Sequence, residues 1–160
     1  MRRRVLGEEH PDTLTSMNDL AVTLAAQGDV AGARALEEQA LAVRRRVLGE
    51  EHPDTLTLMN NLACTLTALG DLGGARALEK QALAVRRRVL GEEHPGTLTS
   101  MNNLGITLWH CGERREALEL MTRTVDASMA KLGSDHPTTR EMMNTLAQMR
   151  AASDDSGANP

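Results

Sequence analysis

The chain repeats itself every 42 residues, and this period limits the folds open to it more than any other feature. Residues 2–43 and 44–85 differ at only eight of 42 positions, and residues 86–127 begin with the same segment, RRRVLGEEHP. A fourth, degenerate copy contains KLGSDHPTTREMMNTLAQM and stops halfway. A strict period of this length predicts an array of stacked units, in which each unit contacts mainly its neighbours.

The composition indicates that these units are helical. Trp109 is the one aromatic residue among 160, and the apolar residues are chiefly Ala, Leu, Val and Met, which favour helices. Sheets depend on aromatic and β-branched residues, and globular cores of this size usually contain several aromatic side chains. We therefore predict an all-α fold without a conventional aromatic core.

Residues that favour the start or the end of a helix divide each unit into two helices. Pro11 suits the first position of a helix, apolar residues then recur at three- and four-residue spacing, Gly28 ends the helix and Asp29 caps the next. About seven helices are expected, with a short stub before Gly7. The predicted organisation is the tail of an incomplete preceding repeat (1–10), three repeats (11–52, 53–94, 95–136), a terminal half repeat (137–152) and a disordered tail (153–160).

The segments MNDLAVTL, MNNLACTL and MNNLGITL, together with ARALEEQALAV and ARALEKQALAV, resemble the tetratricopeptide repeat in its 42-residue, kinesin light chain-like form. The resemblance implies a right-handed α-solenoid of antiparallel helix pairs. The small residues of the family map onto Ala21, Ala63, Gly105, Ala33, Ala75 and Ala117. At the positions where the family has large, often aromatic side chains, this chain has no aromatic residue, which suggests a thinner core. These positions are Leu24, Leu66, Leu108, Glu37, Glu79 and Met121.

The resemblance also implies that the first helix of each unit lines a concave groove for a partner. The candidate peptide-binding residues in that register are Asn18, Val22, Asn60, Cys64, Asn102, Ile106, Trp109 and Asn144. The four asparagines form a column with one residue per unit, and an Asn side chain can both donate and accept hydrogen bonds. They bind the backbone of an extended peptide in one interpretation and stabilise helix packing in the other.

Trp109 has two interpretations as well. It is an anchor for a partner, since Trp residues dominate interface energetics, or it packs against the terminal half repeat. None of the mapped groove positions is Lys or Arg, so a clamp for a carboxylate terminus is not expected. The small, neutral lining favours an apolar or mixed segment.

No pattern indicates catalysis, a metal or a cofactor. The histidines at 10, 52, 94 and 136 lie a full repeat apart, without partners at ligand spacing, and are expected to cap the helix that follows. The Arg triplets that begin at Arg2, Arg44 and Arg86 precede Glu pairs and are interpreted as solvated faces. The net charge of −4 argues against nucleic acid or an anionic membrane, and no apolar run could span a bilayer. With only Cys64 and Cys111, we expect a cytoplasmic protein without disulfides, and the 16 Arg against two Lys suggest a bacterial genome.

The sequence thus predicts a non-catalytic scaffold that binds an extended segment of a protein partner. Two alternatives remain. The chain opens and closes within a repeat, and Met142, Met143, Leu146 and Met149 would leave an apolar face open, so it could self-assemble through its uncapped ends into dimers or longer solenoids. It could also be the sensor arm of a larger signalling protein.

Overall fold

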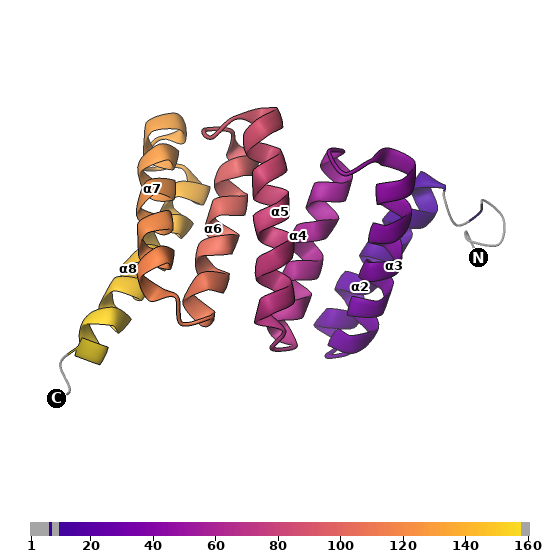
Figure 1. The fold of residues 1–160 in the computed structure, drawn as a ribbon, viewed down its shortest axis with the longest axis horizontal. Coiled ribbons are helices and arrows are strands. Elements are labelled where there is room, and N and C mark those ends of the chain that lie inside the picture. Colours follow the sequence, from indigo (N-terminus) through magenta and orange to yellow (C-terminus); the bar gives the residue numbers. More distant parts are fainter. Residues whose placement is uncertain (1–6, 8–9, 158–160) are drawn as a thin grey trace. The chain divides into compact units, whose positions relative to one another are not determined.

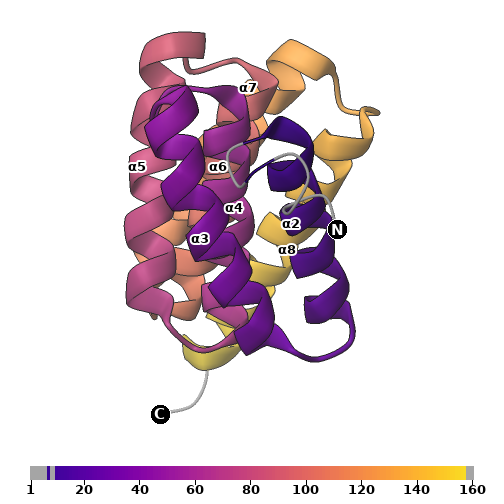
Figure 2. The ribbon, with the colours of Figure 1, turned by 90° about the vertical axis from the view of Figure 1, so that its right-hand side faces the viewer.

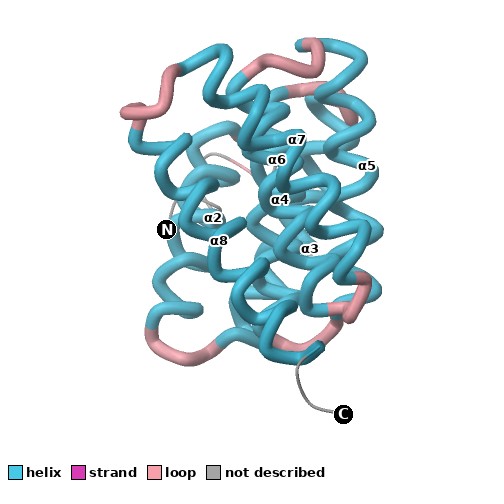
Figure 3. Tube along the Cα trace, turned by 90° about the vertical axis from the view of Figure 1, so that its left-hand side faces the viewer, coloured by secondary structure: helices cyan, strands magenta, loops and turns pink. Residues whose placement is uncertain are grey.

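In the computed structural model, which describes residue 7 and residues 10–157, all regular structure is α-helix (Figures 1 and 3). These residues form the seven helices α2 (Pro11–Ala26), α3 (Val30–Leu48), α4 (Pro53–Ala68), α5 (Leu72–Leu90), α6 (Pro95–His110), α7 (Arg114–Leu132) and α8 (Pro137–Gly157). The expected all-α fold is therefore confirmed. The expected stub before Gly7, and most of the expected tail of a preceding repeat (1–10), lie outside the described residues.

The contacts divide the chain into two compact units, residues 1–82 and 83–160, and the division falls within α5. In the first unit α2 packs on α3 and α3 on α4, and Figure 2 shows α2 and α3 running side by side. In the second unit α6 packs on α7 and α7 on α8. Within each unit, these contacts thus join helices that are consecutive in sequence, as expected of a solenoid.

Each first helix of a repeat begins with the same His-Pro cap. The Nδ1 atom of His10, His52 and His94 accepts a hydrogen bond from the backbone N–H two residues later, at 3.2, 3.2 and 3.0 Å. His136 does the same at 3.3 Å. The imidazole satisfies one of the orphan N–H groups of the helix start, and proline follows where no N–H is needed. The capping role expected for the histidines is confirmed.

The second helices begin with an Asp cap in two repeats. Asp29 accepts a hydrogen bond from the N–H of Gly32 at 2.9 Å, and Asp71 from that of Gly74 at 3.0 Å. Glu113 takes this place in the third repeat and makes no capping bond. The turns use a left-handed glycine every 21 residues, at Gly7, Gly28, Gly49, Gly70, Gly91, Gly112 and Gly133. A glycine adopts this conformation without the steric cost of a Cβ atom.

Small residues allow the helices to pack closely without aromatic side chains. Ala21, Ala63, Ala33, Ala75 and Ala117 are all fully buried, as is Gly105. In the second unit Leu98, Leu108 and Met121 are fully buried in one apolar cluster that continues to Met142, Leu146 and Met149 on α8. The thin core predicted from the sequence is thus built from Ala, Leu and Met.

Two kinds of charged side chain are buried in this core. Glu37 and Glu79 are 3% and 2% exposed. Arg44 and Arg86 are each 8% exposed, so the interpretation of the Arg triplets as solvated faces is wrong for these two residues, while Arg2 lies outside the described residues. Both guanidiniums reach the first turn of the next helix, where Arg44 donates to the carbonyl of Asp54 at 2.9 Å and Arg86 to that of Gly96 at 3.1 Å.

The last helix corrects two further expectations. α8 continues to Gly157, so residues 153–157 are helical and not a disordered tail, and residues 158–160 lie outside the described part. Ala151 and Ala152 are strong helix formers, and no Pro or Gly interrupts the helix before Gly157.

The apolar face expected to be open on α8 is mostly closed. Met142, Leu146 and Met149 are buried inside the second unit, and of the four residues only Met143 is exposed, at 40%. The exposed side carries Arg140 and Arg150. These arginines stand at the repeat positions of leucines on the other first helices, of which Leu24 is half-buried and the rest are buried, namely Leu14, Leu56, Leu98, Leu66 and Leu108.

Candidate functional site

The asparagine column is not uniform in the first unit. Asn18 on α2 is half-buried, and its Oδ1 accepts a hydrogen bond from Nδ2 of Asn61 on α4 at 3.0 Å. Asn60 is 9% exposed, and its Oδ1 is buried without a partner. One asparagine of the column thus joins two first helices, while the next holds an unused acceptor.

The two asparagines of the second unit also differ from each other. Asn102 on α6 is half-buried, and its Oδ1 is also buried without a partner. Asn144 on α8 is exposed. A buried acceptor that lacks a hydrogen bond costs about 1–3 kcal/mol. The side chains of Asn60 and Asn102 therefore stand out as polar groups whose Oδ1 atoms are satisfied neither by the described residues nor by solvent.

Val22 and Cys64 occupy the same repeat position one helix pair apart. Val22 is 55% exposed, an unusual position for a large aliphatic side chain. Cys64 also reaches the surface, yet desolvation by the surrounding protein raises the pKa of its thiol, and the carboxylates of Glu79 and Glu37 raise it further. Since the thiolate is the reactive form, this environment makes Cys64 a poor nucleophile.

Trp109 packs against the apolar cluster of the second unit and also lines a cavity. It is half-buried against the apolar cluster of the second unit, and Arg114 lies over its ring, 5.1 Å from the centroid. It also lines a cavity of about 420 Å³ together with Ile106 and His110 of α6. The opposite side of the cavity comes from α8, through Thr145, Gln148, Met149 and Ala152. Ile106 and Trp109 are thus brought together, and Asn144 is not among the lining residues.

On the α8 side of this cavity, Gln148 stands at the repeat position of Val22, Cys64 and Ile106, so the repeat register places it in the groove. The register does not indicate Thr145, Met149 or Ala152. Met149 belongs to the buried cluster and also lines the cavity. The spacing of apolar residues predicts its burial but not its place in the cavity wall.

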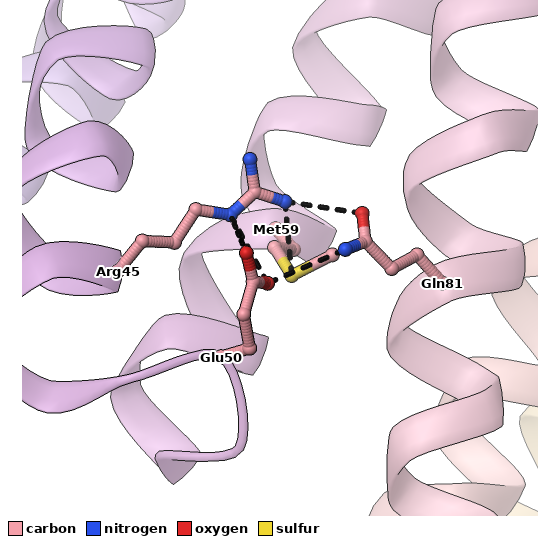
Figure 4. A network of polar contacts seen from close by, with 4 residues as sticks. All are labelled: Arg45, Glu50, Met59 and Gln81. Atoms are coloured by element: carbon pink, nitrogen blue, oxygen red, sulfur yellow. Dashed lines mark hydrogen bonds and ion pairs between the residues drawn. The ribbon is translucent and has the colours of Figure 1, made fainter.

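A polar network joins consecutive helices of the first unit (Figure 4). Arg45 on α3 contacts Glu50 through Nε at 3.0 Å, Gln81 on α5 through Nη2 at 3.1 Å and the sulfur of Met59 on α4 at 3.9 Å. Gln81 in turn donates to Glu50 at 3.3 Å. The network connects Glu50, in the loop after α3, to α3 and α5, and exposed pairs of this kind contribute little stability one by one.

Within the described residues, no group of three or more His, Cys, Asp or Glu side chains is arranged to hold a metal ion. None of the described helices combines the length and the apolar character that a bilayer-spanning helix requires.

Comparisons with known proteins match the repeat pattern. The sequence model of the tetratricopeptide repeat matches residues 13–54, 55–96 and 97–138, two residues later than the boundaries chosen at the prolines. A comparison with curated protein sequences finds no match.

Solved structures resemble the chain over most of its length. A crystal structure of a putative kinesin light chain of Podosopora anserina, with nearly identical TPR-like repeats, is 32% identical, with a TM-score of 0.81 over 96% of this chain and 73% of that one. Its Q17M variant is 28% identical, with a TM-score of 0.76 over 96% and 82%. BtubC (BKLC) from P. vanneervenii shares the fold at 21% identity, with a TM-score of 0.69 over 94% and 68%.

Proposed function

Because the chain belongs to the tetratricopeptide repeat family, whose repeats generally mediate protein–protein interaction, we propose that it is a non-catalytic scaffold. It binds an extended peptide segment of a partner in a groove lined by the first helices of its repeats. The contacts come from the asparagine column, and an apolar side chain of the partner enters the cavity beside Trp109.

The buried acceptors of Asn60 and Asn102 carry this proposal. Both Oδ1 atoms are closed to solvent, so the two side chains must turn toward the groove on binding. An extended peptide then presents backbone N–H groups, which do not depend on its sequence, as the donors that both atoms lack. Asn18 already accepts a hydrogen bond from Asn61, so it contributes less to peptide binding.

The cavity beside Trp109 supports an apolar anchor. Its lining includes Ile106, Met149 and the indole ring, while Thr145 and Gln148 supply polar groups at its margin. A pocket with apolar walls and a few polar groups is typical of a binding site that selects one side chain.

The test begins with peptides selected from a random library on the wild-type chain. Trp109 is the only aromatic residue, so its fluorescence reports binding near the cavity without interference from other side chains. Replacing both Asn60 and Asn102 by Ala is expected to weaken the affinity roughly ten- to hundredfold, since each lost hydrogen bond contributes about 0.5–1.5 kcal/mol. Helicity, measured by circular dichroism, should change little.

The matched control is Gln39→Ala, which removes an exposed amide from the second helix of the first repeat. Its affinity should equal that of the wild type. Unchanged binding by the Asn60/Asn102 variant would overturn the role of the column.

Self-assembly is the second candidate, and exposed Met143 is the observation that favours it. Light scattering across a concentration series separates the two, because a chain that stays monomeric excludes assembly as the main function. We further propose a cytoplasmic location, because a chain with only two cysteines does not have the disulfide framework of small secreted domains.

A further inference from the structure

A second cavity lies in the first unit, where the start of α2, the end of α3 and the start of α4 meet. Its volume is about 270 Å³, and its apolar wall consists of Leu14, Val47 and Leu48. Its polar groups come from Thr15, Arg44, His52 and Asp54. None of the asparagines of the column lines it, so substitutions in the column leave the lining of this cavity unchanged.

Arg44 is the unusual member of this lining. Only 8% of the residue is exposed, and its one hydrogen bond goes from Nη1 to the backbone carbonyl of Asp54 at 2.9 Å. No carboxylate of the described residues lies within ion-pair distance of it, and its other N–H groups have no partner there. A buried charge is normally paired because its removal from water is costly. The guanidinium therefore presents unused donors in a small cavity.

The next repeat shows how such an arginine is satisfied. Arg86 is equally buried and donates to the carbonyl of Gly96 at 3.1 Å and also to Oγ of Ser100 at 2.6 Å. The residue that corresponds to Ser100 one repeat earlier is Leu58, which is fully buried and offers no acceptor. Arg44 thus lacks the second acceptor that its counterpart has.

The remaining polar groups complete a pattern of charges. Nδ1 of His52 accepts a hydrogen bond from the N–H of Asp54 at 3.2 Å, so in the neutral ring the proton resides on Nε2, which is a donor. Asp54 contributes a carboxylate whose side chain is 63% exposed. The cavity therefore combines a buried cation, a carboxylate near the solvent and an aliphatic wall.

We propose that this cavity binds a free α-amino acid with a branched aliphatic side chain. The carboxylate of the ligand accepts hydrogen bonds from Arg44, its ammonium group pairs with Asp54, and its side chain contacts Leu14, Val47 and Leu48. Bidentate recognition of a carboxylate is the interaction for which a guanidinium is best shaped.

The experiment is isothermal titration calorimetry of the whole chain with L-leucine. Two analogues divide the ligand into its parts, since 4-methylpentanoate lacks the ammonium group and 3-methylbutylamine lacks the carboxylate. Leucine should bind at least tenfold more tightly than either analogue. An absence of leucine binding, or equal binding of 4-methylpentanoate, would overturn the proposal.

Val47→Trp tests the position of the site, because the larger side chain fills the cavity. The matched control is Val89→Trp, one repeat later, where the side chain is 50% exposed and outside this cavity. Leucine binding should fall at least tenfold in Val47→Trp and stay unchanged in Val89→Trp. Equal affinities in the two variants would place the ligand elsewhere and contradict the proposal.

Asp54→Asn tests the ammonium contact, with Asp12→Asn as its repeat-matched control outside the cavity. Leucine affinity should fall in the first variant, while that for 4-methylpentanoate should not. The Asn60/Asn102 double variant should bind leucine like the wild type, so failure of the peptide-binding proposal would leave this one intact.

Discussion

Gly105 on α6 lies directly against Met121 on α7, where a methyl group at position 105 would be 2.6 Å from Sδ and 2.7 Å from Cγ of Met121. The first two repeats have alanine at this position, in Ala21 and Ala63, and glutamate in place of the methionine. The third repeat thus contains a bulkier residue on one helix and a smaller one on the other. The two positions form one packing unit.

We predict that Gly105→Ala lowers the free energy of unfolding by about 1–3 kcal/mol, the usual cost of overpacking, despite the higher helix propensity of alanine. Met121→Ala alone should cost about 2–5 kcal/mol because it leaves a cavity. The double variant should lose less than the sum of the two, by more than about 0.5 kcal/mol. Urea denaturation measures all three.

Gly73→Ala is the control for this pair, since it lies in a helix with its nearest outside atom at 4.0 Å. It should stabilise the chain by about 0.4–1 kcal/mol. A Gly105→Ala variant that gains as much would show that the contact with Met121 has no energetic weight.

The Asp caps give a second prediction. Asp29→Ala removes the acceptor for the N–H of Gly32 and should destabilise the chain by about 1 kcal/mol. Glu113→Ala, at the matching position of the third repeat, removes no capping bond and should stay within about 0.5 kcal/mol of the wild type. Thermal unfolding of both variants decides the matter, and equal losses would argue against a capping effect.

A third prediction concerns pH. Desolvation raises the pKa of buried Glu37, and a hydrogen bond with Thr65 lowers it by a smaller amount. The folded state therefore holds this proton more tightly than the unfolded chain, whose glutamates titrate near about pH 4.3. The contribution of Glu37 to stability is full below that pH and is lost as the pH rises through its folded-state pKa.

Glu37→Gln should remove this contribution. The drop in unfolding free energy between pH 5 and pH 7, measured in urea, should be smaller in the variant than in the wild type. Glu141→Gln replaces an exposed carboxylate and should leave the drop as it is. If both variants behave alike, the buried carboxylate is not the source.

The outer side of α8 gives a fourth prediction. Replacing both Arg140 and Arg150 by Leu joins two apolar side chains to exposed Met143 and creates a continuous apolar patch. We expect concentration-dependent dimers in size-exclusion chromatography with light scattering. The double variant to Lys keeps both charges and should elute like the wild type, and a monomeric Leu variant would contradict the prediction.

The helices were predictable because short sequence motifs mark where they begin and end. Pro53 with His52 begins α4, and Gly70 with Asp71 separates it from α5, all within a few residues of sequence. The end of α8 was not predictable in this way. The polar composition of residues 153–157 resembles a disordered tail, whereas Ala151 and Ala152 continue the helix.

The repeat period predicts which positions belong to the candidate site, but it does not predict which residues their side chains contact. The hydrogen bond between Asn18 and Asn61 joins residues 43 positions apart, so no local pattern reveals it. Three consecutive arginines suggest a solvated surface, and only the packing of α3 on α4 shows that Arg44 points inward. The cavity beside Trp109 likewise depends on where α8 passes.

The left-handed glycines recur every 21 residues, although the two turns of a repeat differ in length. Between Ala26 and Val30 the turn has three residues, and between Leu48 and Pro53 it has four. The length of such a chain can consequently change only in steps of a whole repeat without disturbing the fold. Gain or loss of 42 residues, as recombination between near-identical coding segments would produce, preserves every helix pairing, whereas a change of 21 would exchange first and second helices and bring Asp caps to positions that require His-Pro.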